Sequence, residues 1–164
     1  MCVRTRKSYD RVMSDTPTSA DDRAARAWGA LLHVHATLVP VLDRELQRSA
    51  GISLAWYDVL LELHAASGHQ LRMTELGQRV VLSRTRVSRL VDEMATSGMV
   101  RREANSDDKR SSFAVLTDVG RAAFIRAAPT YLDGIERHFG SHLDDAELST
   151  VGAALWRVHE EEKS

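Results

Sequence analysis

The 164-residue sequence has few of the residues from which disulfide-rich, metal-binding or membrane-spanning proteins are built. Its one cysteine, Cys2, excludes an internal disulfide and a cysteine-rich zinc ribbon. It has no run of about 18 apolar residues, so we expect no transmembrane helix and no membrane partner. The charged residues Arg4, Arg6 and Lys7 precede no apolar stretch of the kind found in a secretory signal, which predicts a cytoplasmic protein.

The sequence also lacks the motifs of the common enzyme classes. It has no glycine-rich phosphate loop, no GxSxG or HExxH motif, and no serine, histidine and aspartate in the order of a known catalytic triad. His138 and His142 have a spacing that could place both on one helix face, but Gly140 lies between them and no third ligand is evident. We therefore predict no enzyme activity, no bound metal and no cofactor.

The remaining composition is that of a single globular domain. The chain is 43% hydrophobic and 27% charged, and its length suffices for one domain with its own core. Its net charge of -1 does not indicate a nucleic-acid partner, but the charges are unevenly distributed. Residues 79–102 contain six arginines and two acidic residues, whereas residues 133–164 contain eight acidic and three basic residues. This polarity favours a protein that docks one end on DNA.

The clearest pattern runs from Leu71 to Gly120, where the sequence predicts two helices joined by a turn. Residues 73–79 form the shorter helix. In the longer one, residues 84–97, an apolar stripe repeats at helical spacing and the opposite face is crowded with arginine and hydroxyl groups. Arginine bonds bidentately to guanine, and serine or threonine bonds base edges or phosphates, so this face suits the major groove of DNA. The residues that we expect to bind DNA from this helix and its N-cap are Ser83, Arg84, Thr85, Arg86, Ser88 and Arg89.

Capping residues predict where the helices begin and end. Ser53 and Thr117 are expected to cap the helices that follow them, because their hydroxyl groups can accept from the free amides of the first turn. Gly98 is expected to end the arginine-rich helix in the left-handed conformation, with Met99 as the apolar partner of a Schellman motif. After Thr117 the helical pattern resumes beyond Pro129, which predicts either one kinked helix or two abutting ones.

A β-hairpin is predicted to follow the arginine-rich helix. Residues 99–103 and 112–116 have strand composition, and polar turn residues separate them. The tip of this hairpin carries Asp108, Lys109 and Arg110, which we expect to form the second contact with DNA. A narrow minor groove concentrates negative potential, and that potential favours Lys109 and Arg110.

In this order and spacing, the motifs resemble the MarR family of bacterial winged helix-turn-helix regulators. The resemblance covers residues 24–160 and rests on the arginine-rich helix, SGMVRRE at 97–103, Asp-x-Arg at 108–110 and LTDVG at 116–120. It implies a mainly α fold, a winged helix-turn-helix with a small two-stranded wing and long N- and C-terminal dimerisation helices. It further implies a homodimer that binds double-stranded DNA at a pseudo-palindromic operator, with Arg110 in the minor groove and Asp108 orienting it.

The predicted organisation is a tail followed by one domain. Residues 1–20 show no periodicity, so we expect a tail without fixed structure, either inert or a basic arm that adds phosphate contacts. Residues 21–164 are predicted to form a single MarR-like domain. Within it, residues 53–120 make the DNA-binding lobe, and residues 21–50 and 121–162 make the dimerisation helices, whose apolar stripes are wider than a lone small domain needs.

A small-molecule effector is a further implication of the resemblance, since phenolic or aromatic acids often bind between the dimerisation helices and the DNA-binding lobe. The candidate pocket residues are Trp28, His35, Trp56 and Asp58. The alternative is that Trp56 belongs to the core and Asp58 pairs with a nearby arginine.

The predicted function is that of a ligand-responsive transcriptional regulator, for which repression is the commoner outcome in the family and activation also occurs. The alternative is a winged-helix module that binds other proteins and not DNA. Such a module would be expected to lose the arginines of both contact regions, whereas this sequence retains them.

Overall fold

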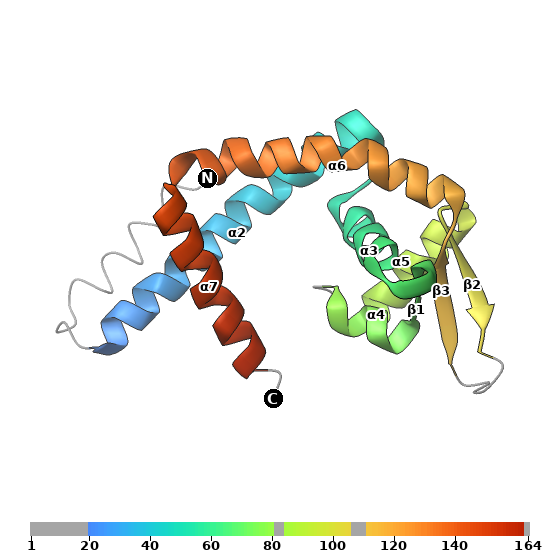
Figure 1. Ribbon diagram of the computed structural model, residues 1–164, viewed down its shortest axis with the longest axis horizontal. Coiled ribbons are helices and arrows are strands. Elements are labelled where there is room, and N and C mark those ends of the chain that lie inside the picture. Colours follow the sequence, from blue (N-terminus) through green and yellow to red (C-terminus); the bar gives the residue numbers. More distant parts are fainter. Residues whose placement is uncertain (1–19, 81–83, 106–110, 163–164) are drawn as a thin grey trace. The chain divides into compact units, whose positions relative to one another are not determined.

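The structure is a computed structural model that describes residues 20–80, 84–105 and 111–162 (Figure 1). The predictions for the tail up to residue 19, for the cap Ser83 and for the hairpin tip at Asp108, Lys109 and Arg110 lie outside these residues. The chain divides into two compact units, Met1–Pro40 and Val41–Ser164. Across the three described ranges, no helix is long and apolar enough to cross a membrane.

Helix α2, Ala20–Ala50, begins in the first unit and ends in the second. In the first unit, Arg26 Nε donates to Asp22 Oδ1 over 3.2 Å, one helical turn away. The helix continues past Pro40. In the second unit, Asp43 Oδ1 accepts from the Leu54 amide over 2.8 Å and so satisfies a free N–H at the start of the next helix.

The second unit contains a winged helix-turn-helix lobe (Figure 1). Its elements in chain order are α3 (Leu54–Ala65), η1 (Ser67–His69), β1 (Gln70–Arg72), α4 (Met73–Arg79), α5 (Arg84–Thr96), β2 (Val100–Ala104) and β3 (Ser112–Leu116). The strands form an antiparallel sheet in the order β1-β3-β2. The predicted two-stranded wing is therefore confirmed as β2 and β3, and β1 adds a third strand on the other edge of β3.

The lobe is held by one apolar core. Leu60 and Leu63 of α3, Leu76 of α4, and Val91 and Met94 of α5 are all completely buried. Burying a side chain of this kind stabilises the fold by about 1.5 to 3 kcal/mol relative to leaving it exposed. The apolar stripe of α5 therefore faces the core, and its polar face points to solvent.

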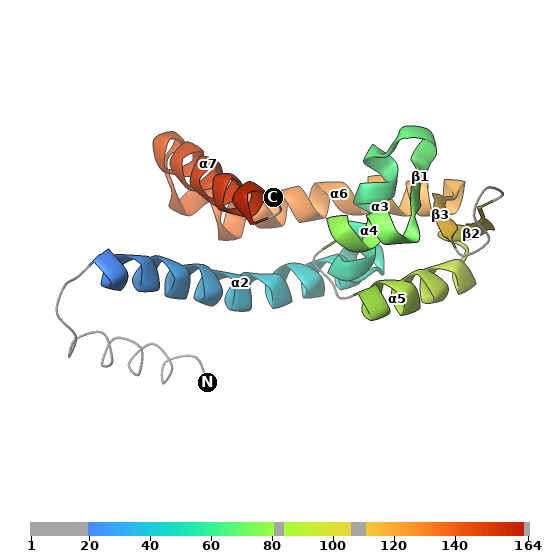
Figure 2. The same ribbon diagram turned by 90° about the horizontal axis from the view of Figure 1, so that it is seen from below.

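A long helix, α6 (Asp118–His138), runs from the sheet to the C-terminal elements η2 (Gly140–His142) and α7 (Asp145–Glu161) (Figures 1 and 2). It is one helix through Pro129, not two abutting ones. It packs on α3 through aromatic rings: Tyr57 lies 5.4 Å from Phe124 and 4.6 Å from Tyr131, centroid to centroid. None of the residues of α7 is buried.

Candidate nucleic-acid interface

Helix α5 presents the predicted contact face to solvent. Val87 is 1% exposed and anchors the helix in the core, whereas Thr85, Arg86 and Arg89 are exposed on its other side. Ser88 lies half-buried at the edge of that face. Arg84 is the first residue of the helix. The groups that can bond bases or phosphates thus lie together on the first turns of α5.

The end of α5 is a Schellman motif, as predicted. Gly98 has a φ of +76°, and its amide donates to the Ala95 carbonyl over 3.0 Å. The Met99 amide donates to the Met94 carbonyl, also over 3.0 Å. The motif satisfies the last carbonyls of the helix and turns the chain directly into β2.

The LTDVG segment fastens α6 to this turn. Thr117 Oγ1 donates to the Gly98 carbonyl over 2.7 Å and accepts from the Gly120 amide over 3.1 Å. Gly120 lies so close to the turn that a Cβ atom there would be 2.0 Å from the Met99 carbonyl oxygen. Only glycine permits this approach, which explains the spacing of threonine and glycine that the sequence shows.

The base of the wing is closed by two hydrogen bonds. The Asn105 backbone amide donates to the Ser111 carbonyl over 3.2 Å, and the side-chain Nδ2 of Asn105 donates to Ser111 Oγ over 2.8 Å. Asn105 is only 5% exposed. These bonds join the end of β2 to the start of β3, next to the segment that carries the predicted wing contacts.

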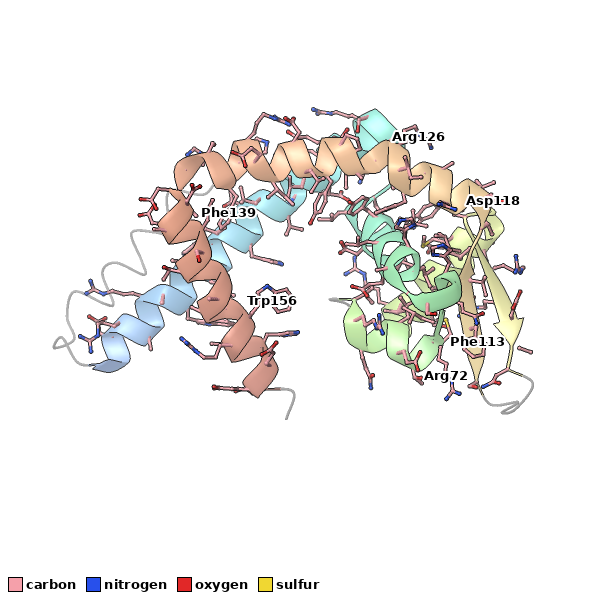
Figure 3. All side chains as sticks on the ribbon, in the orientation of Figure 1. Arg72, Phe113, Asp118, Arg126, Phe139 and Trp156 are labelled. Atoms are coloured by element: carbon pink, nitrogen blue, oxygen red, sulfur yellow. The ribbon has the colours of Figure 1, made fainter. Side chains whose placement is uncertain are left out.

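The outer face of the sheet carries two arginines, each in contact with a partner on the sheet. Arg72 of β1 stacks over the ring of Phe113 on β3, with its Cζ 5.9 Å from the ring centroid (Figure 3). Arg101 Nε donates to Glu103 Oε1 over 2.7 Å along β2. These residues lie on the side of the sheet that faces away from the core residues Leu71 and Ala114.

Arg102 is a residue of the candidate interface that the sequence analysis missed. Its guanidinium reaches from β2 to α5, where Nε bonds Asp92 Oδ1 over 2.8 Å and Nη2 bonds Ser88 Oγ over 2.9 Å. The alternation along β2 could have revealed it. Arg102 shares its face of the strand with the buried Val100, and a charged side chain on a core-facing position requires a partner.

The predicted pocket residues fall in different parts of the molecule. Trp28 and His35 lie on the part of α2 that belongs to the first unit, whereas Trp56 and Asp58 lie on α3 in the second. Trp56 is half-buried against the core of the lobe. A pocket shared by all four residues stays a prediction.

Asp58 is a half-buried carboxyl group on α3. Burial, and to a lesser degree the nearby Glu62, raise the pKa of Asp58 to about 6. Among the described parts of the chain, Asp58 forms no ion pair with an arginine. The alternative in which an arginine neutralises it is therefore wrong within these residues.

Comparisons with known proteins point to one family. Residues 50–111 match the MarR family. A MarR family transcriptional regulator from Streptomyces coelicolor, solved in complex with DNA, is 32% identical and superposes with a TM-score of 0.79 over 89% of this chain and 91% of that one. AbsC, a MarR family regulator from the same organism, is 28% identical with a TM-score of 0.78, over 90% of this chain and 98% of AbsC.

A curated relative agrees with these structures. The transcriptional repressor YetL of Bacillus subtilis is 28% identical over 95 residues. The alignment covers 58% of this chain and 57% of YetL, so the chain spans little more than half of that relative. The aligned residues are too few to carry the activity of the whole relative over to this chain.

Proposed function

Because the chain belongs to the MarR family of transcriptional regulators, we propose that it binds double-stranded DNA through α5 and the β2–β3 wing and thereby regulates transcription. The observation that carries the proposal is the solvent-facing surface of α5, where Thr85, Arg86 and Arg89 lie opposite the apolar stripe that packs into the core. A helix with this surface fits the major groove, where arginine reads guanine. The relative from Streptomyces coelicolor was solved in complex with DNA, which supports DNA binding by this chain.

The regulator acts as a homodimer in this proposal. Helix α7 is amphipathic, yet in the single chain Trp156, labelled in Figure 3, is 65% exposed and Val158 is 59% exposed. Leu155 and Val151 are exposed on the same helix. A helix with so much exposed apolar surface requires a covering partner, and a second copy would place two α5 helices on half-sites about 34 Å apart.

An aromatic acid is the proposed effector, and Trp56 and Asp58 of α3 are proposed to contact it. The raised pKa of Asp58, about 6, bears on this choice. When protonated, the carboxyl group can donate to the carboxylate of a ligand, and when ionised it repels that carboxylate. We therefore expect the binding of an aromatic carboxylate to be accompanied by proton uptake and to be tighter below pH 6 than above it.

A gel-shift titration tests the DNA-binding proposal. The wild-type chain is titrated against the DNA that flanks its own gene, first alone and then with a panel of aromatic acids. Replacing Arg86 or Arg110 by alanine should lower the affinity by about 1 to 3 kcal/mol for a base-contacting arginine. Arg126→Ala is the matched control, because Arg126 is exposed on α6 outside the proposed contact regions.

The outcomes separate the two candidate functions. A retarded band that an aromatic acid abolishes would support a ligand-responsive DNA-binding regulator, and a band that no acid changes would contradict the effector. Absence of a band at low salt, where phosphate contacts alone should suffice, would contradict DNA binding and favour a protein-interaction module.

A further inference from the structure

We propose that Arg102 is a positioning residue that sets the register of α5 against the wing, an inference that rests on the proposed DNA-binding function. Its Nε donates to Asp92 Oδ1 over 2.8 Å. Its Nη2 donates to Ser88 Oγ over 2.9 Å and to the Ser88 carbonyl oxygen over 3.3 Å. Its Nη1 lies 3.4 Å from Ser112 Oγ on β3. One guanidinium of β2 thus links the recognition helix to both strands of the wing.

Arg102 bonds two residues of α5, Ser88 and Asp92, and the spacing of these residues explains how the contact could fix the position of the helix. Ser88 and Asp92 are four residues apart, so they lie on the same side of the helix about one turn from each other. A planar guanidinium that bonds both groups restrains the rotation of α5 about its axis and its displacement along that axis. Both quantities decide which base edges the side chains of α5 reach in the major groove.

The link also determines how Ser88 can act on DNA. Arginine has no acceptor, so the Ser88 hydroxyl accepts from Arg102 and cannot donate to it. The hydroxyl hydrogen remains available to donate outward. Its partner would be an acceptor, such as a phosphate oxygen or the N7 or O6 atom of a purine.

Arg102 differs in this respect from its neighbour Arg101. Arg101 lies on the other face of β2, is 58% exposed and pairs with Glu103 on the same strand. The Arg102 side chain is 32% exposed, and its Nε, Nη1 and Nη2 atoms all donate to protein atoms. Arg101→Ala is therefore the matched control, since it removes the same charge from the same strand but leaves α5 anchored.

The test measures sequence discrimination as well as affinity. The wild-type chain selects a duplex from a randomised library, and a scrambled duplex of equal length and composition serves as the non-specific probe. Affinities for both duplexes are measured over a range of salt concentrations for wild type, Arg102→Ala, Arg102→Lys, Arg101→Ala, Asp92→Asn and the Arg102→Ala/Asp92→Asn double variant. Thermal unfolding of each variant confirms that it is folded.

Arg102→Ala should lower the ratio of selected to scrambled affinity about 10- to 100-fold, the effect of misplacing a bidentate base contact. Arg102→Lys should bind the scrambled duplex as wild type does but should not restore the ratio, because one ammonium cannot hold both Ser88 and Asp92. Asp92→Asn should lower the ratio even though it removes a negative charge close to the DNA. The double variant should be no worse than Arg102→Ala, since both changes break one link. Arg101→Ala should leave the ratio unchanged.

Two results would overturn this inference but leave the proposed function standing. In the first, Arg102→Ala discriminates between the two duplexes as well as wild type. In the second, Arg102→Ala lowers by about one unit the slope of log K against log salt concentration for the scrambled duplex. The second result would identify Arg102 as a direct phosphate contact. If Arg102→Ala does not fold, Arg102→Lys and Asp92→Asn decide the question by the same ratio. A wild-type chain that enriches no sequence and binds neither duplex at low salt would overturn the proposed function itself.

Discussion

Replacing Gly120 by alanine should destabilise the protein strongly, although it puts a better helix former into a helix. An alanine Cβ would lie 2.0 Å from the Met99 carbonyl oxygen and 3.0 Å from Leu116 Cδ1. Real Cβ atoms essentially never approach another atom within 3.0 Å, so the two backbone segments must separate by at least about an ångström. That separation opposes two hydrogen bonds, from Thr117 Oγ1 to the Gly98 carbonyl and from the Thr117 backbone amide to the Met99 carbonyl.

The expected loss of unfolding free energy in Gly120→Ala has three contributions. Overpacking costs about 1 to 3 kcal/mol, and weakening two hydrogen bonds costs about 1 kcal/mol for each. The greater helix propensity of alanine offsets about 1 kcal/mol. We therefore expect the free energy of unfolding to fall by about 2 to 4 kcal/mol, a large part of the 5 to 15 kcal/mol that is typical of a domain.

Equilibrium urea unfolding, followed by far-UV circular dichroism at one protein concentration, measures this loss. With a slope of about 2 kcal/mol/M, the midpoint should fall by about 1 to 2 M. Ala122→Gly is the control, because Ala122 is exposed in the same part of α6 and its replacement should cost about 1 kcal/mol by propensity alone. If Gly120→Ala were as stable as wild type or more stable, the close approach of α6 to the turn after α5 would be refuted.

Three further predictions concern charge and assembly. The pKa of Asp58 is about 6 in the folded protein and 3.8 ordinarily. Ionisation of Asp58 therefore lowers the free energy of unfolding progressively from about pH 3.8 to about pH 6, and by a constant amount above that range. Asp58→Asn should therefore raise stability by about 2 to 3 kcal/mol at pH 7.5 and change it little at pH 4, in urea unfolding. The pKa of Glu45 is lowered, first by a hydrogen bond from His138 and also by Arg137. Glu45→Gln should therefore lower the free energy of unfolding at neutral pH. The difference in stability between the variant and wild type should vanish as the pH falls through the lowered pKa of Glu45. Trp156→Glu should weaken the homodimer by about 2 kcal/mol, roughly 30-fold in Kd, by analytical ultracentrifugation.

Each of these three has a contrary result. An Asp58→Asn gain of equal size at both pH values would mean that ionisation is not its cause. A Glu45→Gln variant with unchanged stability at neutral pH would show that the contact of Glu45 with α6 contributes nothing. A Trp156→Glu chain that stays dimeric at all concentrations would place the dimer contact away from α7.

Local sequence determined the helices, their ends and the arginine-rich face. Ser53 and Thr117 cap α3 and α6 as expected, because a hydroxyl group bonds an amide only three residues away. Gly98 ends α5 because its conformation is a property of the residue itself. The strand composition of residues 99–103 and 112–116 and the polar turn between them predicted the hairpin, and the contact face of α5 follows from helical spacing alone.

Tertiary structure decided what depends on residues far apart in the chain. Strand β1 has three residues, too few for a pattern, and exists because it pairs with β3 more than forty positions later. The link from Arg102 to Ser88 spans 14 residues, and the contact of Glu45 with His138 spans 93. No local propensity encodes such pairs, since their energy appears only when the core has brought the elements together. The sequence thus determined which groups α5 presents to solvent, and the packing of β2 on α5 decided that Arg102 bonds two of its polar residues.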